Sequence, residues 1–185
     1  MKSKKYLLIA FALLVLAQLF VPFQMIFQKE KVLKDGIAVK FRTAPIDPND
    51  PFRGKYIYLN YDDELTTHKT GQKWEAGIPV KVYLKIDEKG FAHIDKLSRE
   101  KLSGEENHLY VDAQIYNYDN NKGIVHISYP FDRFYMEEHK APEAEKTFRE
   151  QNREKPVSTY AIIKVLDGDA VIEDVIAGGK SVTEL

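Results

Sequence analysis

The chain has 185 residues, 27 basic and 28 acidic side chains, a net charge of −1, and no cysteine. The lack of cysteine excludes a disulfide framework, a thiolate nucleophile and a thiolate metal site. The charge is balanced and no stripe of Lys or Arg is present, which argues against nucleic acid as a partner.

The N-terminus has the pattern of a membrane anchor. Lys2, Lys4 and Lys5 precede 22 uncharged residues, 6–27. As a helix, at about 1.5 Å per residue, this run would be about 33 Å long and would cross a hydrocarbon core. The positive-inside rule keeps the lysines in the cytoplasm and sends the remainder of the chain across. The expected division is a cytoplasmic tail (1–5), a transmembrane anchor (6–28) and an extracytoplasmic domain (29–185).

A cleaved signal peptide is the alternative interpretation of this segment. Val15, Leu16 and Ala17 before Gln18 fit a small-residue cleavage site. The uncharged, mostly apolar sequence continues for ten residues past that point, however, and a secreted protein would expose it to water. The uncleaved anchor is therefore favoured. No cysteine follows the apolar run, so a bacterial lipoprotein is excluded.

About 155 residues follow the anchor, which is ample for one compact domain and short for two. Without the three N-terminal lysines, this part carries 24 basic against 28 acidic residues, a charge near −4. Its apolar residues alternate with polar ones in segments separated by Gly and Asp turns, which predicts strands and hairpins. The expected elements are a strand at 37–42, hairpins of 78–86 with 91–94, 108–118 with 123–129 and 158–166 with 170–176, and one helix at 142–153. This order predicts a mainly β fold, a small antiparallel barrel or sandwich with a single soluble helix.

Residues 43–61 predict a rigid turn. Three prolines fix φ and remove backbone donors, so no helix or central strand runs through 45–51. The Asp and Asn residues among them can bond their own backbone, and Arg53 is expected to pair with Asp47 or Asp50. Gly54 permits a backbone conformation or a close approach that other residues do not tolerate.

The segment after this turn, 55–61, predicts one strand. Ile57, Leu59 and Tyr61 would occupy one face, with the intervening tyrosines on the other. Half-buried sheet faces favour Tyr, whose ring packs while its hydroxyl stays wet, so packing is the first expectation for these rings. A solvent-facing pair of Tyr56 and Tyr58 beside Arg53 would instead form a partner-docking patch.

The same stretch resembles the GDYXXLXY family of bacterial membrane-anchored proteins. Gly54, Tyr56, Leu59 and Tyr61 match its defining run, and Lys55 stands where the family name has Asp. The preceding turn matches the usual lead-in at Thr43, Pro45, Asp47, Pro48, Asp50 and Arg53. A second, weaker match is Arg133, Phe134 and Tyr135 with Glu138 downstream.

The resemblance implies a single-pass protein of the bacterial inner membrane that associates with a multi-spanning membrane protein. The main hypothesis is therefore a binding or accessory protein without enzymatic activity and without a cofactor. A domain that binds a soluble ligand through an aromatic face is the alternative. The candidate motif and docking residues are Thr43, Asp47, Asp50, Arg53, Gly54, Lys55, Tyr56, Tyr58, Leu59, Tyr61, Arg133, Tyr135 and Glu138.

Metal binding is weakly indicated. The acidic residues at 47, 50 and 62–64 offer oxygen ligands, but their spacing lacks the Gly and the terminal Glu of a calcium loop. The five histidines form no paired metal-binding motif. We expect a structural use of the acidic residues and no metal site.

A remote catalytic hypothesis remains. An anchor followed by a hydroxyl residue and a Pro-containing turn is similar to membrane signal peptidases, which use a Ser/Lys dyad on an all-β scaffold. Thr43 would be the nucleophile and Lys85 the base. Thr is a poor nucleophile because its methyl group crowds attack, and Lys85 lies in a plain alternating strand, so this hydrolase is the least favoured reading.

Overall fold

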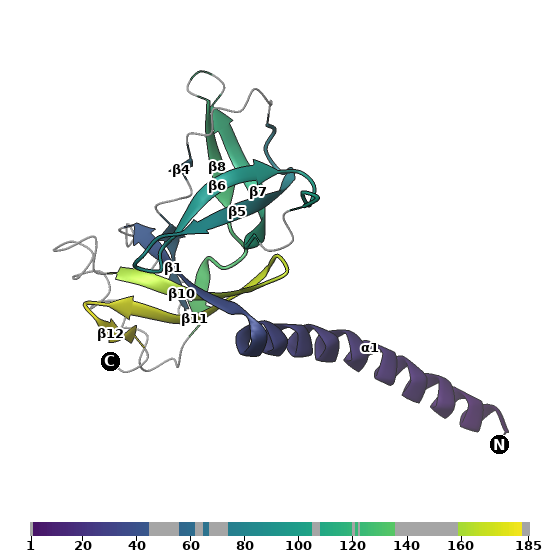
Figure 1. Cartoon of the computed structure of the whole chain (residues 1–185). Helices are drawn as coiled ribbons and strands as arrows, with labels where there is room; N and C mark the ends of the chain where they lie inside the picture. Colours follow the sequence, from purple (N-terminus) through teal and green to yellow (C-terminus); the bar gives the residue numbers. More distant parts are fainter. Residues whose placement is uncertain are drawn as a thin grey trace.

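The computed structural model describes residues 2–44, 56–61, 65–66, 74–104, 108–119, 121, 123–135 and 159–182. These residues form one long helix followed by strands (Figure 1). The elements are α1 (Lys2–Asp35), β1 (Ile37–Ala44), β2 (Tyr56–Tyr58), β3 (Asn60–Tyr61), β4 (Leu65–Thr66), β5 (Pro79–Ile86), β6 (Ala92–Ser98), β7 (Tyr110–Asp119), β8 (Ile124–Ser128), β9 (Arg133–Tyr135), β10 (Thr159–Leu166), β11 (Asp169–Ala177) and β12 (Lys180–Ser181).

Helix α1 includes the whole apolar run and continues through the charged residues after it. It contains Pro22 and projects away from the strands (Figure 1). By length and composition it is able to cross a membrane: its apolar window has a mean hydropathy of 2.4 and is not buried against the rest of the protein. The helix ends at Gly36, whose N–H donates to the carbonyl of Val32 at 2.9 Å. A Cβ on Gly36 would collide with that carbonyl, so a glycine is needed here.

The described strands form a curled antiparallel half-barrel, which confirms the predicted mainly β fold. One sheet has the order β12-β11-β10-β1-β3, and a second has the order β4-β8-β7-β5-β6. The three predicted hairpins are present as β5–β6, β7–β8 and β10–β11. Strand β1, which follows directly on the helix, pairs with β10 near the other end of the chain.

Two hairpin tips join the sheets. The tip of β5–β6 reaches β1, where the Lys40 N–H donates to the Gly90 carbonyl at 3.0 Å. The tip of β10–β11 reaches β7, where the Asp112 N–H donates to the Gly168 carbonyl at 2.8 Å. Each sheet therefore supplies a turn that bonds to a strand of the other, and the two bonds hold the sheets in their curled arrangement.

The core lies between the inward faces of the two sheets. On β5, for example, Val80, Val82 and Leu84 are buried and Lys85 is exposed, whereas Tyr83, which alternation places on the outer face, is also buried, beside the ring of Tyr110. Val39 and Phe41 of β1 and Ala161, Ile163 and Val165 of β10 supply the other side of the same core.

The structure corrects the segment predicted as one strand at 55–61. Its described part forms two short strands, β2 and β3, which belong to different sheets. The ladder breaks at Leu59, whose N–H turns to donate to the carbonyl of Asp132 at 2.8 Å. Alternation alone does not reveal that a chain crosses from one sheet to the next.

Smaller differences concern the strand ends. Strand β6 runs to Ser98, four residues beyond the predicted end at 94, and the short strands β4, β9 and β12 were not predicted. The predicted helix at 142–153 and the turn at 45–55 lie outside the described residues.

Candidate functional site

Strands β2 and β9 bring together two segments that the sequence analysis singled out separately. They form an antiparallel pair in which Tyr56 is opposite Tyr135, Ile57 opposite Phe134, and Tyr58 opposite Arg133. The tyrosine-rich motif and the Arg-aromatic-aromatic segment are thus one two-stranded sheet. We call it the motif sheet.

Residues next to the motif sheet tie it to the core. After β2, Leu59 is buried and bonded to Asp132 just before β9. Tyr61 is 2% exposed and its hydroxyl donates to the carbonyl of Phe131 at 2.6 Å. This short buried hydrogen bond satisfies the phenol hydroxyl and holds Tyr61 against Phe131. The Tyr61 ring is packed as expected, but its hydroxyl does not face water as the sequence analysis expected, because it is buried and bonded to a backbone carbonyl.

Four aromatic rings form a cluster beneath these bonds. Phe41, Tyr61, Tyr129 and Phe131 have ring centroids 5.0 to 5.8 Å apart, the range of favourable aromatic pairs. Most of the pairs are edge-to-face, and Tyr129 and Phe131 are stacked. We call this set the aromatic cluster. It comes from β1, β3 and the turn before β9, so the sequence pattern of no single element reveals it.

Thr43 lies beside the aromatic cluster, paired with Tyr61 across β1 and β3. Its side chain is 0% exposed, and among the described residues its hydroxyl has no hydrogen-bond partner. Lys85, the proposed base, lies on the outer face of β5 and is exposed. The nucleophile of the remote hydrolase hypothesis is thus in the core, where a substrate reaches it only after rearrangement.

The outer face of β9 is accessible. Phe134 is buried toward the core, whereas Arg133 and Tyr135 on either side are exposed, Tyr135 by 66%. The Arg133 guanidinium lies 3.8 Å from the carboxylate of Asp132. Alternation on β9 therefore presents one cation and one aromatic ring from the same short strand.

The structure describes only part of the candidate set. Tyr56 and Tyr58 are described by their backbone pairing only, and their docking role remains a prediction. The other candidates outside the described residues are Asp47, Asp50, Arg53, Gly54, Lys55 and Glu138, together with the acidic residues 62–64.

A charged cluster that the sequence analysis missed surrounds the tip of β5–β6. The Asp87 carboxylate accepts the N–H of Phe91 at 2.8 Å and that of Lys89 at 2.9 Å, and His93 Nε2 lies 3.3 Å away. These donors, the Phe91 N–H first, hold the pKa of Asp87 below its usual value. Arg42 lies 3.7 Å from the same carboxylate and 4.3 Å from the centre of the Phe91 ring.

A second charged pair lies on the outer face of β5 and β7. Lys81 Nζ donates to Asp112 Oδ1 at 2.6 Å, and this bond raises the pKa of Lys81 above its usual value. The same ammonium lies 4.9 Å from the centre of the Tyr110 ring. In both places the charged groups bond to neighbouring residues of the fold. Their role is therefore structural.

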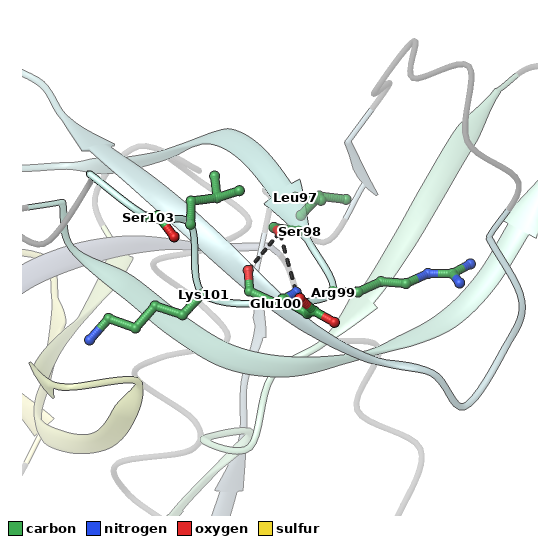
Figure 2. A pocket seen from close by; sticks show the side chains of 7 residues that line it. Leu97, Ser98, Arg99, Glu100, Lys101 and Ser103 are labelled. Atoms are coloured by element: carbon green, nitrogen blue, oxygen red, sulfur yellow. Dashed lines mark hydrogen bonds between the residues drawn. The ribbon is translucent and has the colours of Figure 1, made fainter.

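The segment after β6 forms an open pocket lined by residues 97–103 (Figure 2). Ser98 Oγ donates to the carbonyl of Glu100 at 2.6 Å and accepts its N–H at 3.3 Å, so the serine is used within its own turn. Arg99 and Lys101 extend to opposite sides of the segment and do not converge on the pocket (Figure 2). Nor do the described residues contain a group of three His, Asp or Glu side chains able to hold a metal.

These observations define a small β domain continuous with an apolar helix that fits a single-pass membrane anchor. The model of the GDYXXLXY protein family matches residues 18–175, and the chain belongs to this family. Comparisons with curated proteins and with solved structures gave no match.

Proposed function

We propose that the protein is an anchored accessory subunit, in which α1 spans the bacterial inner membrane with its N-terminus in the cytoplasm and the β domain binds a multi-spanning membrane protein outside it. The observation that most supports this binding role is the motif sheet. It combines the two segments shared with the family and exposes Arg133 and Tyr135. Arg and Tyr are enriched at the centres of protein interfaces.

The buried residues beneath this surface support a binding role. The aromatic cluster and the hydrogen bond from Tyr61 to Phe131 hold in place the segment that leads into β9. A rigid base lowers the entropy lost when a partner binds, so an exposed Arg and Tyr on it gain affinity from preorganisation. The exposed apolar surface of α1 offers a second contact to a partner within the bilayer.

The test is purification of the full chain from its native membranes in mild detergent, with a double Arg133→Ala and Tyr135→Ala variant. Tyr116→Ala is the matched control, because Tyr116 is an exposed tyrosine on β7, away from the motif sheet. We expect a multi-spanning protein to co-purify with the parent and with the control, and to be lost with the double variant. Circular dichroism must show parental melting for both variants.

The outcomes separate two parts of the proposal. Retention of the partner by a folded double variant would place docking elsewhere than on β9. If no multi-spanning protein co-purifies with the parent, the accessory-subunit function itself is wrong.

A further inference from the structure

The tip of the β10–β11 hairpin lies beside the last turns of α1. Lys29 Nζ is 3.3 Å from the carboxylate of Asp169, at the start of β11. Val32 is 3% exposed and packs the helix against β10 and β11. Lys164 Nζ also donates to the Gly36 carbonyl at 3.4 Å. Helix and hairpin are therefore joined by packing as well as by charge, and the hairpin tip is held at the level of Lys29.

This level is close to the end of the apolar run. Lys29 comes two residues after Phe27, about 3 Å farther along the helix axis. The polar headgroup region adds about 5–8 Å to each side of the hydrocarbon core. When α1 spans a bilayer, Lys29 and the Asp169 carboxylate next to it consequently lie at the depth of the lipid headgroups.

Exposed apolar side chains occur at the same junction. Leu33 of α1 and Ile37 of β1 are 37% and 56% exposed, although they follow the apolar run. Ile37 is paired with Val165 near the hairpin tip. At about 1.5 Å per residue, Leu33 lies about 9 Å beyond Phe27 along the helix axis, at the outer edge of the headgroup layer, and Ile37 lies farther out.

The ammonium of Lys101 lies on the other side of the tip. The space beside Gly168 is filled by Tyr110, and the ammonium of Lys101 is 5.3 Å from the centre of that ring. Among the described residues Lys101 forms no ion pair with a carboxylate, and its side chain is exposed. An exposed ammonium beside an aromatic ring is suited to a lipid phosphate.

We propose that the tip of the β10–β11 hairpin, residues 166–169, rests in the phospholipid headgroup layer of the membrane that α1 spans, with Lys101 facing lipid phosphates. This proposal uses the anchor of the proposed function and is independent of any protein partner. The contact gives the domain one fixed orientation on the membrane. The opposite end of β11 and strand β12 then lie on the side away from the bilayer.

The depth of the tip is measured with the full chain in phospholipid nanodiscs. The protein has no cysteine, so single cysteines can carry a fluorophore without other changes. Asp167→Cys reports on the tip, and Lys180→Cys, about 30 Å away at about 3.3 Å per strand residue, is the matched control. With lipids spin-labelled at the headgroup, we expect quenching at position 167 to be at least five-fold stronger than at 180. Equal quenching at the two positions overturns the proposal.

Two further labels complete the experiment. Lys101→Cys should be quenched like position 167, and it carries the test if the substitution at the turn prevents folding. Leu14→Cys, in the middle of the apolar run, should be quenched by lipids labelled in the acyl chain. Quenching at 14 without quenching at 167 and 101 refutes the headgroup contact alone. Lack of quenching at 14 refutes the membrane-spanning anchor as well, and with it both proposals.

Discussion

The two hairpin tips that join the sheets have the same task and are built differently. Each contributes a glycine with positive φ, +84° at Gly90 and +90° at Gly168, and each glycine carbonyl accepts one N–H from the opposite sheet. At Gly168 a Cβ would lie 2.5 Å from an Asp112 oxygen and 2.7 Å from the Tyr110 ring. At Gly90 the nearest atoms belong to the Lys40 side chain, at 3.9 Å.

The first tip is instead surrounded by charge. The Asp87 carboxylate accepts two backbone N–H groups and also lies close to His93 and Arg42. The Arg42 guanidinium in turn lies over the Phe91 ring. The β5–β6 tip therefore depends on electrostatic contacts that pH and salt can weaken, whereas the β10–β11 tip depends on close steric fit. The tight tip is also the one beside α1.

The largest expected effect is that of Gly168→Ala. The substitution adds the cost of a side chain at positive φ to the crowding against Tyr110 and Asp112, about 2–5 kcal/mol of unfolding free energy in total. The Asp112 carboxylate can turn away only by giving up its bond to Lys81, and the Tyr110 ring, which is buried, leaves the new methyl group little room. Urea unfolding followed by the fluorescence of the buried Trp74 measures the loss.

Gly90→Ala is the matched second prediction. It has the same backbone cost without the crowding, so we expect a loss of about 1–2 kcal/mol. The same urea titration compares the two variants directly. If both lose the same stability, the distinction between a fitted tip and a charged tip is wrong.

Acid should weaken the β5–β6 tip selectively. The pKa of Asp87 is lowered in the folded state, so its contribution is present above the unfolded pKa and is lost as the pH falls through the folded pKa. Asp87→Asn keeps an acceptor oxygen without the charge. We expect the parent to be more stable than this variant at neutral pH, and the difference to vanish in acid. A difference that is constant with pH would contradict the electrostatic account.

The smallest effect is expected in alkali. The pKa of Lys81 is raised, so its contribution is complete below the usual value of 10.5 and is lost as the pH rises through the higher folded pKa. The ion pair with Asp112 is partly exposed, and solvent screening keeps its contribution small. The stability difference between the parent and Lys81→Gln should shrink only at strongly alkaline pH. Shrinkage already at neutral pH would show that another group controls it.

Much of the fold could be predicted because it follows from local patterns. The apolar run predicts α1, and alternation bounded by Gly and Asp turns predicts the three long hairpins with ends correct to a few residues. Strand β9 was missed because three residues, Arg133–Tyr135, are too few for alternation to show. The split at Leu59 was missed because it depends on Asp132, a partner far away in the sequence.

The candidate site was predictable in part only. The family motif marked Tyr56, Leu59 and Tyr61, and the segment at 133–135 was marked separately, but their pairing is a long-range contact that one sequence does not reveal. The aromatic cluster has the same origin, since its rings come from distant elements. The turn between 86 and 91 was predicted, whereas the contact of its Asp87 with Arg42 required the approach of β1 to the β5–β6 tip.

The pairing of β1 with β10 has a consequence for the order of folding. Strand β1 directly follows α1, while its partner β10 comes about 120 residues later in the sequence, since Phe41 is opposite Ala161. If α1 is inserted into a membrane first, the edge of β1 that pairs with β10 stays unpaired until the residues up to β10 have been synthesised and have reached the same side. During this interval the edge is open to wrong pairing with other chains. Pairing of β1 with β10 is thus a late step in folding of the domain, and loss of β10 would leave β1 without this neighbour.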